Sequence, residues 1–148
     1  MPEAATIAKA RRDKRQGKAP STQAGEFVRE EIHHVREGKH GARSAKQAIA
    51  IGLSKARRAG VKLPSPPSTA TERTRQSAKS ATRAARRHTK PSPRRSRAVR
   101  QALKHEGHSA TTTKALSRQA TTAAKRRSAS ARSASARKAA RTRAKEHA

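Results

Sequence analysis

Large apolar side chains recur at helical spacing only in the first half of the chain. A first stripe consists of Val28, Ile32 and Val35 at positions i, i+4 and i+7, with Phe27 beside it. This spacing places the side chains on one face of a helix. Ser21 or Thr22 is a suitable N-cap, acidic residues occupy the early turns, and Gly38 is a suitable end. The pattern therefore predicts a helix between these residues.

A second stripe follows after a short connection that contains two glycines. Its apolar positions are Ala45, Ala48, Ile49, Leu53 and Ala56. Ser44 and Gln47 have the spacing of a capping box at its start. Gly60 is placed for a left-handed C-cap, and Pro64 prevents continuation of the helix. The two stripes can face each other, so residues 21–63 are predicted to form a helical hairpin module.

The segment before the hairpin, residues 1–20, is basic. Ala4 to Arg15 can form a third, short helix, in which Ile7 is the only sizeable apolar side chain. A module of this size has few large side chains at its seam, and domains this small usually need a staple, a metal or a partner. We expect either a homodimer through the hairpin or loose order.

The composition changes at Pro64. Residues 64–70 read as a Pro/Ser linker, and residues 71–148 are rich in Ala, Lys, Arg, Ser and Thr. Stretches 71–88, 96–105 and 113–127 have helix propensity, but repulsion between their cations should keep them unfolded when free. The predicted fold class is thus small all-α, a helical hairpin or three short helices, followed by a disordered Ala/Lys/Arg-rich tail.

Charge and composition exclude most classes of enzyme. The 148 residues contain 38 Lys and Arg against 9 Asp and Glu, a formal net charge of +29. Leu, Ile, Val and Phe together number 13, too few for a conventional enclosed core. There is no Cys, no Gly-rich phosphate loop and no enclosed carboxylate pair. We therefore expect no catalytic residues, no cofactor and no enzymatic activity.

The excess of cations points to a polyanionic partner. No apolar run reaches the roughly 18 residues of a membrane span, and a signal-peptide core is lacking, so we expect a cytoplasmic, nucleoid-associated protein without membrane binding. Duplex DNA is favoured because phosphate contacts release counterions without requiring a folded pocket. RNA is the weaker alternative, since the chain has one Phe and no Trp or Tyr for base stacking.

The candidate DNA-binding residues are basic side chains at the end of the second hairpin helix and along the tail. They are Lys55, Arg57, Arg58, Lys62, Arg83, Arg86, Arg87, Arg94, Arg95, Arg126, Arg127, Arg141 and Arg143. The first four can instead serve only as C-terminal partners of the helix dipole. The unit Ser92-Pro93-Arg94-Arg95 resembles the Ser-Pro-basic-basic units of linker-histone and sperm-histone tails, which implies contacts in the minor groove. Generic tail charge is the alternative.

Histidines near the hairpin turn offer a weaker signal. Glu30 with His33, and Glu31 with His34, have the Glu-x-x-His spacing of di-iron bundles, and His40 follows in the connection. One helix cannot complete such a site without further ligands from another helix. We therefore predict no metal site and interpret these side chains as a solvated polar face.

Three motifs carry a family resemblance. They are Glu26-Phe27-Val28, the run from His34 to Gly41, and the run from Ser54 to Val61. Over residues 24–64 the sequence resembles a small bacterial domain of unknown function, whose members are often labelled plasmid stabilisation protein and commonly carry a basic C-terminal extension. The resemblance implies no catalytic or binding residue.

These observations lead to a functional expectation with two alternatives. We expect a nucleoid-associated or DNA-compacting protein that neutralises phosphates with little sequence specificity. The first alternative is a protein-interaction or dimerisation module for plasmid maintenance, with a tail that localises it to DNA. The second is a basic protein associated with RNA or the ribosome.

Overall fold

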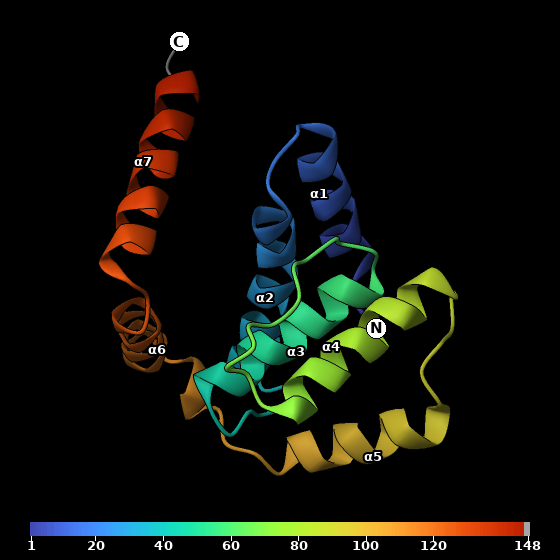
Figure 1. Ribbon diagram of the computed structural model, residues 1–148. Coiled ribbons are helices and arrows are strands. Elements are labelled where there is room, and N and C mark those ends of the chain that lie inside the picture. The colour runs from blue at the N-terminus through green and yellow to red at the C-terminus, as the bar shows by residue number, and fades with distance from the viewer. Residues whose placement is uncertain (147–148) are drawn as a thin grey trace. The chain divides into compact units, whose positions relative to one another are not determined.

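The computed structural model describes residues 1–146, and all its regular elements are helices. A larger unit spans Met1–Thr112, and a smaller unit begins at Thr113. The larger unit contains α1 (Ala4–Arg15), α2 (Pro20–Arg36), α3 (Ala45–Arg58), α4 (Glu72–Arg86), α5 (Pro93–Lys104) and the short 3-10 helix η1 (Ser109–Thr111) (Figure 1). The smaller unit contains α6 (Thr113–Lys125) and α7 (Ala129–Glu146). Within residues 1–146 no helix combines the length and the apolarity that crossing a bilayer requires.

The predicted hairpin is present as α2 and α3, which pack against each other along their length (Figure 1). The Ser44 hydroxyl accepts a hydrogen bond from the Gln47 amide at 3.2 Å and so caps α3. Gly60 ends the helix in a left-handed conformation with φ +91°, and the Val61 amide donates to the Ala56 carbonyl at 3.0 Å. These contacts confirm both helix ends that the sequence indicated for α3.

Two small apolar clusters form the core of the larger unit. In the first, Phe27 is fully buried with Ala10, Ala24 and Ala56, and Ile7 and three other aliphatic side chains pack around them. The second cluster consists of Val35, Ala42, Ala48 and Ala110. At Gly52 a β-carbon would lie 2.7 Å from the Val28 Cα, so a glycine is what lets α2 and α3 approach this closely.

The N-terminal helix has the predicted limits, whereas the start of α2 differs from the prediction. Helix α1 packs on α2 and brings Ile7 to the first cluster. Helix α2 begins at Pro20, with Ala19 as its N-cap, so neither Ser21 nor Thr22 caps it. Proline suits the first helical position because its ring fixes φ and its missing N–H would have no partner there.

The prediction of a disordered tail over residues 71–148 is wrong for residues 71–146, because helices α4 to α7 occupy most of this range, and residues 147–148 lie outside the described part of the chain. The Thr71 hydroxyl caps α4 by accepting from the Thr74 amide at 3.3 Å. Ala78 and Ala81 are buried on the face of α4, which packs on α3. In α6 and α7 the abundant alanines and arginines are strong helix formers. The prediction gave too much weight to charge repulsion and too little to this propensity and to small-residue packing.

The segment that follows α5 returns to the hairpin turn. The Gly41 amide donates to the Leu103 carbonyl at 2.8 Å, and the Ala42 amide donates to the Gly107 carbonyl at 2.9 Å. Ala110 and Thr111 are buried nearby. At Gly41 a β-carbon would collide with the carbonyl of Glu106, so only glycine permits this approach. The connection between α2 and α3 is therefore held by the end of α5 and the residues that follow it.

Candidate nucleic-acid interface

Helix α4 places four of its five cations on one face and its buried alanines on another. The four are Arg75, Lys79, Arg83 and Arg86, and the fifth, Arg73, lies outside this row. Their spacing of four, four and three residues keeps them on one side of a helix. Ala78 and Ala81 face α3 and are at most 9% exposed. Packing of the alanine face thus orders the cations in a fixed row.

This row forms one wall of a basic groove of about 450 Å³. The groove is lined by Arg57, Leu63, Pro64, Ser65, Pro66, Arg75, Ala78, Lys79, Thr82, Arg83 and Arg86. Five of these residues are cations and none is acidic. A concave surface lined by charges of one sign concentrates its potential on a ligand of the opposite sign.

Two arginines of the groove are held in place by neighbouring groups. Arg57 donates from Nη2 to the Pro64 carbonyl at 2.9 Å, and burial lowers the pKa of its guanidinium from the usual very high value. The guanidinium nevertheless stays protonated at neutral pH, because arginine does not lose its proton in proteins. Arg75 donates from Nη1 to the Ser68 carbonyl at 3.2 Å and pairs through Nη2 with Glu72 at 2.6 Å. Among the described residues, Arg75 is thus the one cation of the groove with an acidic partner, and Lys79, Arg83 and Arg86 have neither a carboxylate nor a carbonyl partner.

Helix α5 presents a second basic face. A shallow depression there is lined by Arg94, Arg97, Ala98, Arg100, Gln101 and Lys104. Its four cations follow each other at intervals of three or four residues. The α5 face thus resembles the α4 row in spacing and in the absence of acidic side chains from its lining.

The structure gathers some of the predicted residues and separates others. Arg57, Arg83 and Arg86 share the groove, and Arg94 lies on the α5 face. Exposed positions outside the groove are occupied by Arg58, Lys62, Arg87 and Arg95. Arg126, Arg127, Arg141 and Arg143 belong to the smaller unit. There the guanidinium of Arg127 donates to the Ala131 carbonyl at 2.9 Å and to the hydroxyl of Ser135.

The prediction omitted several cations that the structure places on these surfaces. They are Arg75, Lys79, Arg97, Arg100 and Lys104. Their i, i+3 and i, i+4 spacing was visible in the sequence. This spacing places the cations on one face only if the segment is helical, and the sequence predicts disorder for this region.

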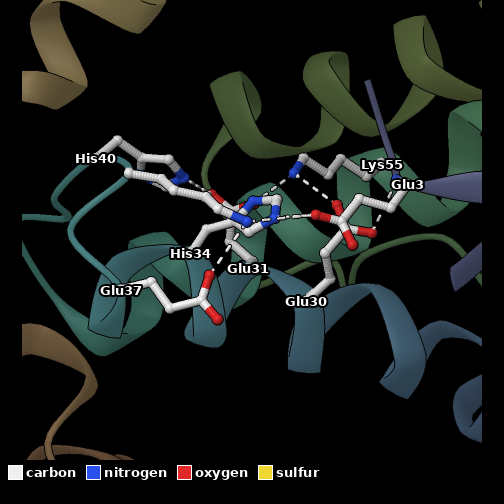
Figure 2. Close-up of polar contacts among 8 residues, drawn as sticks. Glu3, Glu30, Glu31, His34, Glu37, His40 and Lys55 are labelled. Atoms are coloured by element: carbon white, nitrogen blue, oxygen red, sulfur yellow. Dashed lines mark hydrogen bonds and ion pairs between the residues drawn. The ribbon is translucent and has the colours of Figure 1, made fainter. Parts of the chain in front are cut away.

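Lys55 has a different environment from the other predicted DNA contacts. Its Nζ lies 2.7 Å from Oε2 of Glu31 and 3.2 Å from Oε1 of Glu30 (Figure 2). The side chains of Glu31 and Glu30 are 1% and 3% exposed. The ammonium group of Lys55 therefore compensates two buried carboxylates and is not free to bind phosphate in this conformation.

The carboxylate of Glu30 belongs to an ordered network between α1, α2 and α3. Burial by itself would raise the pKa of Glu30, but hydrogen bonds from the Thr6 side chain and the Glu3 amide, together with Lys55, outweigh burial and lower it. The Glu3 amide donates to Oε2 of Glu30 at 3.1 Å. The polar face that the sequence analysis assigned to solvent is thus partly internal at Glu30 and Glu31.

Residues 3–66 match the model of a family of unknown function, DUF6496. The matched segment contains α1, α2 and α3 and ends before α4. This agrees with a domain of unknown function over residues 24–64 and extends the likeness to α1. The match carries neither the plasmid-stabilisation label nor a likeness to histone tails. No curated protein and no solved structure matches the chain.

Proposed function

We propose that the protein binds duplex DNA through its phosphates, with little sequence preference, as a nucleoid-associated or DNA-compacting factor. The observation that carries this proposal is the groove between α4 and the end of α3, in which five cations and no carboxylate form the lining. Counterion release from neutralised phosphates supplies the driving force. The α5 face offers further phosphate contacts in the larger unit, and the cations of the smaller unit offer contacts of their own.

The spacing of the α4 row suits a regular polyanion. From Arg75 to Arg86 the row spans eleven residue-to-residue steps, or about 16 Å along a helix axis. Each strand of B-DNA carries one phosphate per about 3.4 Å of its axis, so several phosphates lie within reach of one row. Lysine and arginine contacts to phosphates position a protein without reading bases.

The aromatic content favours a duplex over unpaired bases. Phe27 is the only Phe, Trp or Tyr of the chain, and it is fully buried in the core. Recognition of single strands relies on exposed ring faces on which bases stack. Binding to phosphates of a double helix needs no such surface. The proposal includes contacts of Ser92-Pro93-Arg94-Arg95 in the minor groove, as its resemblance to histone-tail units implies.

A salt series with fluorescent duplex DNA tests this function on the full chain. If about 10 to 15 phosphates are engaged, log K falls with log salt at a slope of roughly −9 to −13. The double variant Arg83→Ala/Arg86→Ala should reduce the slope by about 2, since each lost phosphate contact removes about 1. The matched control Arg11→Ala/Arg12→Ala, which removes the same charge from α1, should leave the slope unchanged.

Competition with duplex RNA and single-stranded DNA separates this proposal from its alternatives. Preference for RNA over duplex DNA would contradict it and favour association with RNA or the ribosome. Weak DNA binding at physiological salt would also contradict it and favour a plasmid-maintenance module that acts through a protein partner or a homodimer of residues 21–63. An equal loss of slope in both double variants would show that net charge, and not the groove, determines binding.

A further inference from the structure

A cluster of one carboxylate and two imidazoles lies where α2 meets the connection to α3. Its members are Glu31 and His34 of α2 and His40 of the connection (Figure 2). One ligand atom from each of the three side chains lies within 4.8 Å of the other two. The carboxylate is 1% exposed, whereas the side chains of His34 and His40 are 13% and 14% exposed. The cluster is therefore compact, internal on one side and reachable on the other.

The orientation of His40 matches that of a metal ligand. Nδ1 of His40 lies 3.0 Å from the carbonyl oxygen of Gly41, so a proton on Nδ1 makes this hydrogen bond. In the neutral ring, Nε2 then carries a lone pair, and it points at Oε1 of Glu31 from 3.2 Å. Two electron-rich atoms at this distance require a proton or a cation between them. Metal-binding histidines commonly donate their other N–H to a carbonyl or carboxylate in this way.

The buried carboxylate of Glu31 also supports a bound cation. Both of its carboxylate oxygens are buried, and neither has a hydrogen bond of acceptable geometry. The Lys55 ammonium lies near Oε2 at 2.7 Å, which leaves Oε1 directed at His40. A buried carboxylate oxygen without a hydrogen-bond donor is costly unless a cation compensates it.

We propose that Glu31, His34 and His40 bind one Zn²⁺ ion, with Oε1 of Glu31 as the carboxylate ligand. Two imidazoles and one carboxylate are a ligand set that Zn²⁺ accepts, with a fourth position left for water. Ligand atoms on one tetrahedral Zn²⁺ lie about 3.4 Å apart. The 3.2 Å between Glu31 and His40 already fits, and the ligand atom of His34, which lies within 4.8 Å of both, has to approach them on binding.

Surrounding groups support the ligands. Nε2 of His34 lies 2.9 Å from Oε1 of Glu3, so the Glu3 carboxylate is within hydrogen-bond distance of this ring. Lys55 holds the oxygen of Glu31 that does not face His40. A pocket of about 200 Å³ has Glu3, Glu30 and His34 in its lining, so it reaches one of the three ligands from solvent. Carboxylates that orient histidine ligands contribute about 10-fold to 100-fold in metal affinity.

The ion would fix the connection between α2 and α3. His40 precedes Gly41 and Ala42, whose amides bind the carbonyls of Leu103 and Gly107. Zn²⁺ on His40 would therefore stabilise both the connection and the segment after α5 that docks on it. The sequence predicts no metal site, because the Glu-x-x-His spacing of one helix cannot complete it. The third ligand comes from the connection, which brings His40 to Glu31.

Titration of the metal-free full chain with Zn²⁺, in competition with a chromophoric chelator, tests the proposal. We expect one tight site per chain, and Co²⁺ in its place should give the visible absorption of a four-coordinate ion. His40→Gln and Glu31→Gln should each lower the affinity at least 100-fold, and Glu3→Gln about 10-fold. His33→Gln, on the exposed side of α2, is the matched control and should leave the affinity unchanged.

Hydrogen exchange gives a second test, which does not depend on the number of Zn²⁺ ions bound per chain. Zn²⁺ should slow hydrogen exchange at the amides of Gly41 and Ala42 in the wild type and have no such effect in His40→Gln. Because His40 lies in a connection, its variant keeps the test decisive if Glu31→Gln does not fold. Absence of a tight site, or an equal loss of affinity in His33→Gln, would overturn the proposal and leave Glu31 and His40 as an ion pair. The DNA-binding proposal would be unaffected.

Discussion

The two sides of helix α3 differ in whether their charged side chains are paired within the protein. Toward α1 and α2, Lys55 lies between the buried carboxylates of Glu30 and Glu31, so charges are compensated within the protein. Toward α4, Arg57 joins Lys79, Arg83 and Arg86 in a groove whose lining has no carboxylate. The same residue types therefore stabilise the fold on one side and remain available to a polyanion on the other.

The largest expected effect comes from removing the cation of the compensated side. Lys55→Met leaves two carboxylates buried without their ammonium partner, and loss of one partner from a buried pair costs about 3–5 kcal/mol. Urea unfolding at neutral pH measures this loss. Lys46→Met, an exposed position on the same helix, should change the free energy of unfolding by less than about 0.5 kcal/mol. Equal effects of the two substitutions would contradict the comparison.

A smaller effect is expected from acid titration of Glu30. Its pKa is lowered in the folded state, so its carboxylate stabilises the protein fully above the ordinary carboxyl pKa. This stabilisation is lost as the pH falls through the lowered pKa. Glu30→Gln should therefore be less stable than the wild type at neutral pH, and the difference should shrink on acidification. Unfolding measured between neutral pH and about pH 3 checks this, and a difference that grows toward acid pH would contradict it.

The smallest effect on stability is expected on the exposed side. Arg97 belongs to the α5 face and has no ion pair among the described residues. Arg97→Ala should change the free energy of unfolding by less than about 0.5 kcal/mol, and it should reduce the salt slope of DNA binding by about 1. Urea unfolding and the salt series of DNA binding, both measured on the purified Arg97→Ala variant, check the two expectations. A stability loss comparable to that of Lys55→Met would remove the distinction between the two sides.

Local signals predicted a large part of the fold. The limits of α1, the cap of α3 at Ser44 and its left-handed end at Gly60 all follow from nearby residues. The prediction of disorder after residue 70 failed because repulsion between cations was weighed without the alanine faces that pack, such as Ala78 and Ala81 on α3. The row of cations on α4 was missed for the same reason.

The sequence by itself determined the helical hairpin, the excess of positive charge and the lack of exposed aromatic rings for stacking, because helix periodicity, caps and composition are local or additive properties. Only the tertiary structure decided which charges are compensated and which are free. Three contacts depend on how separate elements pack: Lys55 with Glu31, His40 with the same carboxylate, and the end of α5 with Gly41. Such contacts leave no periodic signal in the chain, because they arise from the packing of whole helices.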